Sequence, residues 1–462
     1  AGQCSAVQVG PGAPIKCNDR GTSQTSGGGG PWRHGASTAT ELDASASANS
    51  PATRKNTFTS ALDLPTLDPN SVPDFEGPEL DGVVHFLHQT LSESGPGFFY
   101  LKMSDVERDA AETALRLSRE QFFALPLKIK MALSNGPDTY FRYNGYRIPS
   151  SGPGYRGSGL DDNFKFDSRE SFNVGWDTEA AQQAGILARE DVPYGPTPFP
   201  DSGAEDFKNS CDLYSQILLE RSSWLRRLLA RVLQVVTFRS EGGELAEIGF
   251  PRKLTSGDPT GNKQHIGFHT LEGTLADDSL FNKAPWLLGF VRYSGVPSNV
   301  SERKFGIAPH QDDGVFTLLL TDGSPGLQVC PEWRGTGVHR SEEMFSKRLE
   351  WFNVPYKPGH WVVNLGTMLT RWSAGRLKAT LHRVVIPEDH AVENARFSMP
   401  FFYEPNLDAH IKPMKPIVSS ASEDHVDEHV LDMKTPGDIA LELAQRDGLT
   451  LIKEVGVGIT MS

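Results

Sequence analysis

A series of short apolar runs fills the chain from residue 285 onward, and this feature restricts the fold more than any other. Gly, Pro and Asp separate the runs, which read PWLLGFVRYSG, FTLLLTDGSPGLQVC, LEWFNVP, HWVVNLG, LHRVVIP and ARFSMPFFYEP. Short apolar runs between turn residues are typical of β-strands, and a succession of them is typical of an antiparallel sandwich or jelly roll. The 45 glycines and 32 prolines also favour many turns over a helical bundle. We therefore predict a double-stranded β-helix, or jelly roll, as the core.

Helical patterns lie mostly before this core. Residues 79–93 have an amphipathic pattern, and the longest helical pattern covers residues 204–237. Ser104 and Glu107 have the spacing of a capping box, which would open a helix that runs to Pro126. The predicted class is thus α+β, a jelly-roll core with an N-terminal helical region and flanking helices.

Two short strands are predicted among the N-terminal helices. Leu62 and Leu64 alternate with Asp63 before prolines end the pattern. In the segment SGPGFFYLK, Phe98 and Tyr100 are two residues apart. Because side chains alternate across a strand, these two are expected on one face.

Four regions are predicted along the chain. Residues 1–57 form a low-complexity tail of Gly, Ser, Ala and Thr that has almost nothing to bury and is expected to be disordered. Residues 58–200 form the N-terminal α/β region of the fold. Residues 201–284 hold the long helix and an insertion, the polar and Gly-rich stretch 239–283. Residues 285–448 form the jelly-roll core with a C-terminal helix.

The acidic composition restricts the expected partners. The formal net charge is −13 and the pI is about 5.5. Nucleic acids and anionic membrane surfaces attract basic patches, so we expect neither as a partner. A small-molecule partner is compatible with this charge, and the composition does not decide the oligomeric state.

The cysteines point to a reducing compartment. The chain has four, none in a Cys-x-x-Cys pair, and they are Cys4, Cys17, Cys211 and Cys330. This favours neither a zinc knuckle nor a disulfide framework, so a cytoplasmic location is expected. No apolar run approaches the roughly 20 residues of a membrane span, and the first residues lack a charged-then-apolar signal pattern.

A candidate metal site begins at the segment APHQDDGVFTLLL. His310 and Asp312 are two apart, and on a strand they would point to one face. A third ligand is offered by His382 in the later run LHRVVIP. Two imidazoles and one carboxylate form the facial triad that suits non-haem Fe(II) and leaves coordination positions open.

A candidate anion site follows in the run ARFSMPFFYEP. Arg396 and Ser398 are again two apart on a predicted strand. A guanidinium can bind a carboxylate with two parallel hydrogen bonds, and a hydroxyl on the same face adds a third. Such a pair could hold the distal carboxylate of a dicarboxylate such as 2-oxoglutarate, whose keto-acid end would then chelate the metal.

The motifs HQD (310–312), LHRVV (381–385) and RFS (396–398) occur in this order. Together they resemble the 2-oxoglutarate/Fe(II) dioxygenases of the isopenicillin N synthase-like superfamily. PGFFYL, QFFALPLKIK and GYR (145–147) resemble the N-terminal region of that family, and TPGDIALELAQRDG resembles its C-terminal helix. The resemblance covers residues 58–448.

The resemblance implies a 2-oxoglutarate-dependent non-haem iron dioxygenase, an oxidoreductase that uses Fe(II), 2-oxoglutarate and O2. In such an enzyme the iron ligands would be His310, Asp312 and His382. Arg396 and Ser398 would hold the C5 carboxylate of 2-oxoglutarate.

The resemblance also suggests a role for Tyr293 in the segment VRYSG. It matches a family tyrosine that often touches the same carboxylate, although Ser294 follows it where the family usually has proline. An enzyme of this kind would hydroxylate, desaturate or cyclise a small molecule, here one of specialised metabolism, and release succinate and CO2.

Other functions are compatible with these residues. An oxidase of the isopenicillin N synthase kind would use Fe(II) and O2 without 2-oxoglutarate and can keep a similar Arg and Ser pair. A catalytically silent jelly-roll binding module and a metal-dependent hydrolase are further alternatives. Substrate specificity is expected in residues 140–175 and 239–283, because loops carry binding residues. His265 and His269 in the latter are interpreted as a loop pair, since the Gly-rich surroundings disfavour a helix.

Overall fold

The computed structural model describes a subset of the chain, within the compact unit Phe58–Ser462. The described residues are 60–72, 78–134, 144–147, 169–177, 181, 183, 195–233, 236–239, 245–248, 275–293, 305–333, 346, 348–386 and 395–409. The predicted tail, the His265 and His269 pair, most of the 239–283 insertion and the predicted C-terminal helix lie outside these residues. The boundaries of the four regions stay predictions.

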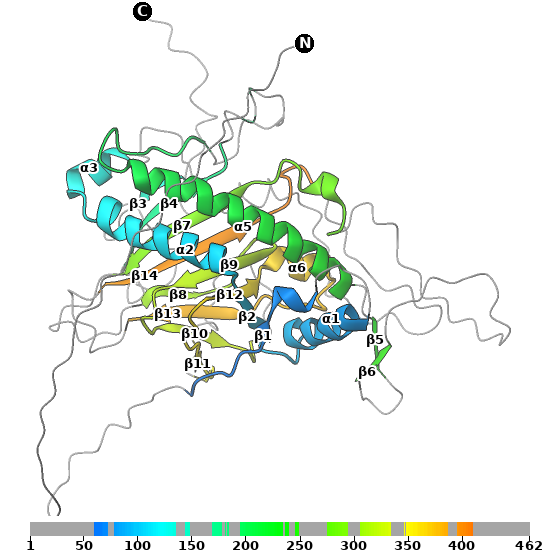
Figure 1. The fold of residues 1–462 in the computed structure, drawn as a ribbon. Coiled ribbons are helices and arrows are strands. Elements are labelled where there is room, and N and C mark those ends of the chain that lie inside the picture. The colour runs from blue at the N-terminus through cyan, green and yellow to red at the C-terminus, as the bar shows by residue number, and fades with distance from the viewer. Residues whose placement is uncertain are drawn as a thin grey trace, which may run out of the picture. The chain divides into compact units, whose positions relative to one another are not determined.

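Two sheets form the core (Figure 1). The eight-stranded sheet runs in the order β1 (Thr66–Leu67), β2 (Phe98–Lys102), β12 (His360–Leu365), β9 (Phe316–Thr321), β14 (Arg396–Tyr403), β7 (Trp286–Tyr293), β4 (Arg169–Gly175) and β3 (Gly145–Arg147). The four-stranded sheet runs in the order β11 (Phe352–Asn353), β10 (Leu327–Cys330), β13 (Leu381–Val385) and β8 (Phe305–His310). Apart from the parallel pair β1 and β2, the strands of these sheets pair antiparallel. The described part of the chain thus confirms the predicted jelly-roll core.

Alternation along the strands separates two buried layers. Phe98 and Tyr100 of β2 pack between the sheets, together with Tyr293 of β7 and apolar residues of β10 and β13. Phe99 and Leu101 of the same strand belong to the cluster on the other face of the larger sheet. The prediction that Phe98 and Tyr100 share a face is confirmed.

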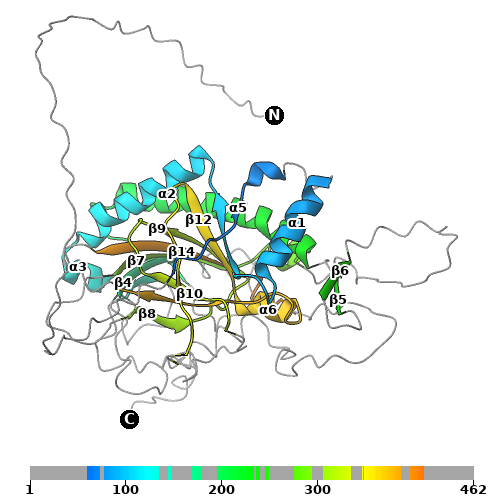
Figure 2. The ribbon, with the colours of Figure 1, turned by 90° about the horizontal axis from the view of Figure 1, so that it is seen from below.

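Helices cover that other face of the larger sheet (Figure 1, Figure 2). They are α1 (Pro78–Leu91), α2 (Asp105–Leu117), the π-helical segment η2 (Ser118–Phe123) and α5 (Glu205–Val232). The short helix α3 (Leu127–Ala132) follows η2, and its apolar side chains Leu127, Ile129 and Met131 are exposed. The short helix α6 (Thr367–Trp372) follows β12, and the 3-10 turns are η1 (Pro69–Ser71) and η4 (Asp278–Leu280). No helix among the described residues is long and apolar enough to cross a membrane.

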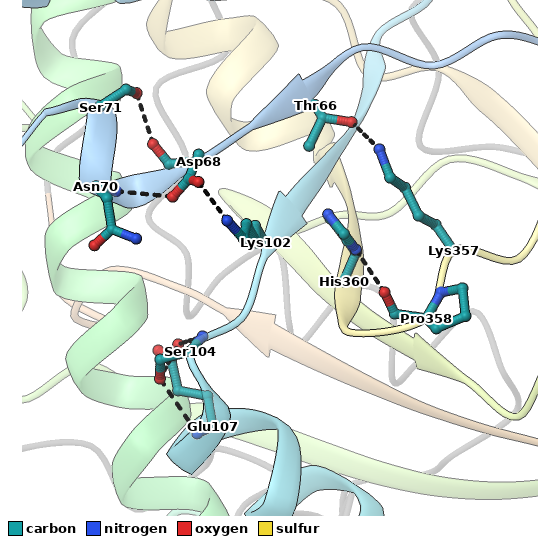
Figure 3. A network of polar contacts seen from close by, with 10 residues as sticks. All are labelled: Thr66, Asp68, Asn70, Ser71, Lys102, Ser104, Glu107, Lys357, Pro358 and His360. Carbon is teal, nitrogen blue, oxygen red and sulfur yellow. Dashed lines mark hydrogen bonds and ion pairs between the residues drawn. The ribbon is translucent and has the colours of Figure 1, made fainter.

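The predicted capping box at the start of α2 is confirmed (Figure 3). The backbone N–H of Glu107 donates to the Ser104 hydroxyl over 3.3 Å, and the N–H of Ser104 donates to the Glu107 carboxylate over 2.7 Å. The same carboxylate accepts a 2.7 Å hydrogen bond from Arg221 of α5. The cap therefore also joins α2 to α5.

Two predicted boundaries are wrong. The helix predicted to reach residue 237 ends at Val232, and the strand β5 (Val236–Arg239) follows and pairs with β6 (Leu245–Ile248). The β-branched run at 235–237 favours a strand over a helix. The first strand lies at β1 instead of 62–64, because the carbonyl of Pro65 accepts the N–H of Tyr100 and starts the parallel pairing there.

Candidate active site

The structure brings His310, Asp312 and His382 together. His310 ends β8 and is directly opposite His382 of β13 across the antiparallel pair. Oδ1 of Asp312 is 3.6 Å from Nε2 of His310 and 3.5 Å from Nε2 of His382. The potential ligand atoms lie within 4.8 Å of one another, and no other such group of His, Cys, Asp or Glu occurs among the described residues.

Asp312 reaches this position differently from the prediction. The sequence suggested that His310 and Asp312 share a face of one strand, but β8 ends at His310 and residues 311–313 are irregular. The backbone carbonyl of Asp312 accepts a 2.7 Å hydrogen bond from the N–H of Thr367 at the start of α6. Asp312 is therefore placed by tertiary contacts instead of strand alternation.

The two carboxylate oxygens of Asp312 have different environments. Oδ2 accepts hydrogen bonds from the Thr317 hydroxyl of β9, over 2.6 Å, and from the Asn364 amide of β12, over 2.7 Å. These bonds hold the carboxylate so that Oδ1 faces the two imidazoles. Sequence reasoning missed both donors, although a lone Asn in the apolar run HWVVNLG was an available signal.

Backbone carbonyls fix the orientation of both imidazoles. Nδ1 of His310 is 2.9 Å from the carbonyl of Ala308, and Nδ1 of His382 is 3.0 Å from the carbonyl of Thr380. A carbonyl only accepts, so Nδ1 carries the proton in each ring. When the rings are neutral, Nε2 of each carries a lone pair that a metal ion can use, within 3.6 Å of Oδ1 of Asp312.

The electrostatics of the site favour a positive charge beside the carboxylate. Burial alone would raise the pKa of Asp312, but His382, His310 and the Thr317 hydroxyl outweigh burial and hold this pKa well below its usual value. Burial would lower the pKa of His382, yet the Asp312 carboxylate raises it above the usual value. A proton on His382 or a metal cation can supply this charge, and the two compete for the same lone pair.

Arg396, Ser398 and Tyr293 form a second group. Arg396 of β14 is paired across the strands with Tyr293 of β7, and its guanidinium lies over the tyrosine ring, 4.8 Å from the centroid. The Ser398 hydroxyl donates to the Tyr293 hydroxyl over 3.3 Å. Arg396 is 2% exposed, yet its Nε and Nη1 have no hydrogen-bond partner among the described residues. A buried guanidinium with unused donors fits a carboxylate ligand, since an unpaired buried charge is costly.

Gly306 connects the two groups. A Cβ added at Gly306 of β8 would lie 2.6 Å from Cδ1 of Tyr293, so only glycine leaves room for the ring against this strand. The same Cβ would also lie 3.0 Å from Cγ1 of Val384 of β13, so Gly306 faces the space between the two sheets. Tyr293 and His310 thus both lie along β8, Tyr293 against Gly306 and His310 at the end of the strand.

Two family models match this chain. One, described as the 2OG-Fe(II) oxygenase superfamily, matches residues 287–405. The other, described as the N-terminal region of the non-haem dioxygenase in morphine synthesis, matches residues 64–201. Together they include more than half of the chain, and the first includes both residue groups described above.

Individual relatives agree with these matches. A 2-oxoglutarate-Fe(II) type oxidoreductase of Aspergillus fumigatus is 26% identical over 313 residues, 68% of this chain and 74% of the relative. The clavatol oxidase claD of Penicillium crustosum is 26% identical over 344 residues, 72% of this chain and 85% of the relative.

A solved structure agrees in fold. It is a full-length protein of Neurospora crassa in complex with alpha-KG and 5-formyluracil, with a TM-score of 0.54 and 21% identity over 84% of this chain and 96% of that chain. The likeness supports the jelly-roll assignment. From the family matches and the relatives, we conclude that this chain belongs to the 2-oxoglutarate/Fe(II)-dependent oxygenases, enzymes that use Fe(II), 2-oxoglutarate and O2.

Proposed function

We propose that His310, Asp312 and His382 hold the iron of this oxygenase. The ligand atoms would be Nε2 of each histidine and Oδ1 of Asp312. The proposal is carried by one observation: the three atoms converge while the other polar atoms of the same side chains are engaged elsewhere. Two imidazoles and one carboxylate suit Fe(II) and leave positions for further ligands.

We further propose that Arg396, Ser398 and Tyr293 bind the C5 carboxylate of 2-oxoglutarate. Arg396 supplies two unused N–H donors, and the two hydroxyls lie beside it. The C5 carboxylate would accept hydrogen bonds from these groups. The positive charge of Arg396 then no longer lies buried without an anion.

Bound iron, together with 2-oxoglutarate and O2, supplies an oxidant strong enough for C–H bonds. The chain itself orients and shields. Thr317 and Asn364 fix the direction of the Asp312 carboxylate. The Phe98 ring meets His382 edge-on, with 5.6 Å between ring centroids, and its complete burial helps to exclude water from that side of the imidazole.

The proposed substrate is a small organic molecule of specialised metabolism, which the enzyme hydroxylates, desaturates or cyclises. The names of relatives support this class, since one is a clavatol oxidase and the Neurospora crassa structure holds 5-formyluracil. The acidic composition is also compatible with a small molecule. A cytoplasmic location stays a prediction from the cysteine content.

Turnover of 2-oxoglutarate tests the proposal. The purified protein with Fe(II), 2-oxoglutarate and O2 should release succinate, and Arg396→Ala and His382→Ala should lose this activity. Arg383→Ala is the matched control, because Arg383 is adjacent to His382 but bonds to Gln328 and lies 3.9 Å from the centroid of the Trp351 ring. Oxidation of a substrate without succinate would favour the oxidase alternative, and no loss in Arg396→Ala would contradict the proposed carboxylate site.

A further inference from the structure

The strand segment that carries Arg396 and Ser398 is held at its end by Asp322. The β9–β14 pairing begins at Ser398 opposite Thr321, and Asp322 is the first residue beyond β9. The N–H of Asp322 donates to the carbonyl of Phe397 over 3.2 Å. In return, the N–H of Phe397 donates to Oδ2 of Asp322 over 2.8 Å. A side-chain carboxylate therefore does here what a backbone carbonyl does inside a sheet.

The Asp322 carboxylate accepts two further hydrogen bonds. Its Oδ1 accepts a 2.9 Å hydrogen bond from the N–H of Ser324, across a turn in which Gly323 has φ +91°. Its Oδ2 also accepts a 2.7 Å bond from Arg119 of η2. The Asp322 side chain is 4% exposed, whereas that of Arg119 is 41% exposed. Both oxygens are thus engaged, and the buried charge has a cationic partner.

Phe397 is clamped from the helix side of the sheet. The Arg119 guanidinium lies over its ring, with Cζ 4.5 Å from the ring centroid. The Phe123 ring meets it edge-on, with 5.6 Å between the ring centroids. Phe397 stands between Arg396 and Ser398 and points to the opposite face. Holding its ring and its N–H therefore fixes the direction of the two neighbouring side chains. The π-helical segment η2 supplies both Arg119 and Phe123.

We propose that Asp322, assisted by Arg119, is a positioning residue for 2-oxoglutarate. It touches neither iron nor cosubstrate, but it holds the backbone between Arg396 and Ser398 at the angle at which both meet one carboxylate. This inference rests on the proposed function of Arg396 and Ser398. A displacement of about 1 Å in a binding group can cost on the order of a hundredfold in function, so the loss of one such contact should be measurable.

The test compares the dissociation constant of 2-oxoglutarate for the Fe(II)-loaded protein, without O2, with the iron affinity of the same variants. Asp322→Ala should weaken 2-oxoglutarate binding by about tenfold and leave iron affinity unchanged, in line with the effect of outer groups around bound ligands. Asp322→Asn keeps an acceptor for the N–H of Phe397 and should restore part of the affinity. Arg119→Gln leaves that acceptor in place and should give a smaller loss than Asp322→Ala.

Two control variants separate positioning from stability. Glu120 also lies on η2, and its carboxylate is 2.7 Å from the Arg116 guanidinium, the distance found between Asp322 and Arg119. This pair is exposed, so Glu120→Ala removes a similar ion pair from the surface. Glu107→Ala removes the buried cap of α2 and should destabilise the fold. Both should bind 2-oxoglutarate as the wild type does.

Three results would overturn the inference. Asp322→Ala could bind 2-oxoglutarate like the wild type while Arg396→Ala does not, or Glu107→Ala could weaken binding as much as Asp322→Ala. The third result applies if Asp322→Ala does not fold. In that case 2-oxoglutarate affinity is measured in Asp322→Asn and Arg119→Gln, and wild-type affinity in both variants would overturn the inference. Wild-type binding by Arg396→Ala as well would instead remove the proposed function on which the inference rests.

Discussion

Replacing Thr317 by valine removes one hydroxyl from the candidate iron site and leaves the side-chain shape nearly unchanged. The hydroxyl donates to Oδ2 of Asp312 over 2.6 Å, and Thr317 is 3% exposed. A hydrogen bond to a charged group contributes about 1.5–3 kcal/mol. Asn364 still donates to the same oxygen over 2.7 Å, so we expect the lower end of this range. About 1.4 kcal/mol corresponds to a factor of ten in a binding constant.

Thr317→Val should therefore weaken iron binding by about tenfold, because one donor alone no longer fixes the direction of Oδ1. The assay is competition with a chelator for Fe(II) under anaerobic conditions. Thr90→Val is the matched control, since Thr90 is also buried and its hydroxyl donates to the carbonyl of Phe86 over 2.8 Å in α1. Equal iron affinity in Thr317→Val and wild type would refute the role given to the Asp312 hydrogen bonds.

Three further predictions concern other contacts. Gly306→Ala should weaken 2-oxoglutarate binding and lower the free energy of unfolding by about 1–3 kcal/mol, because the new Cβ would overlap the Tyr293 ring. Unchanged 2-oxoglutarate affinity in a calorimetric titration would contradict this. The pKa of His382 is raised in the folded state, so its ion pair with Asp312 stabilises the metal-free protein fully below the unfolded pKa of about 6.5 and less as the pH rises through the folded pKa. Iron affinity should increase over the same pH range, because the proton leaves the ligand atom. Denaturant unfolding at several pH values checks the stability, and His382→Gln should remove its pH dependence. Glu107→Ala should lower the free energy of unfolding by about 2 kcal/mol, since it loses both the helix cap and the bond to Arg221; an unchanged urea midpoint would show that the cap contributes nothing.

Local sequence signals predicted most of the fold. The apolar runs after residue 285 became strands because turn residues end each run within a few positions, and the Ser104 and Glu107 box depends only on residues three apart. The end of α5 was predicted wrongly because the helical pattern was continued into the β-branched run at 235–237, which favours a strand, and pairing with β6 stabilises that strand. Pairing partners beyond the local window are not visible in a helical pattern.

The candidate site was predictable in its residue types but not in its support. His310, Asp312 and His382 stood out as potential ligands in or beside apolar runs. The position of Asp312 depends on Thr317 and Asn364, which belong to two other strands, and no spacing rule connects them. Gly306 reads as an ordinary glycine, and its contact with the Tyr293 ring exists only once the two sheets face each other.

The anaerobic visible spectrum of the protein with Fe(II) and 2-oxoglutarate tests the proposed iron and cosubstrate site most directly. A keto acid that chelates Fe(II) gives a metal-to-ligand charge-transfer band, which iron alone does not give. We predict that the band appears when both are added to the wild type and that His382→Ala and Arg396→Ala lose it. Iron binding without the band in the wild type, or an undiminished band in both variants, would contradict the proposed arrangement.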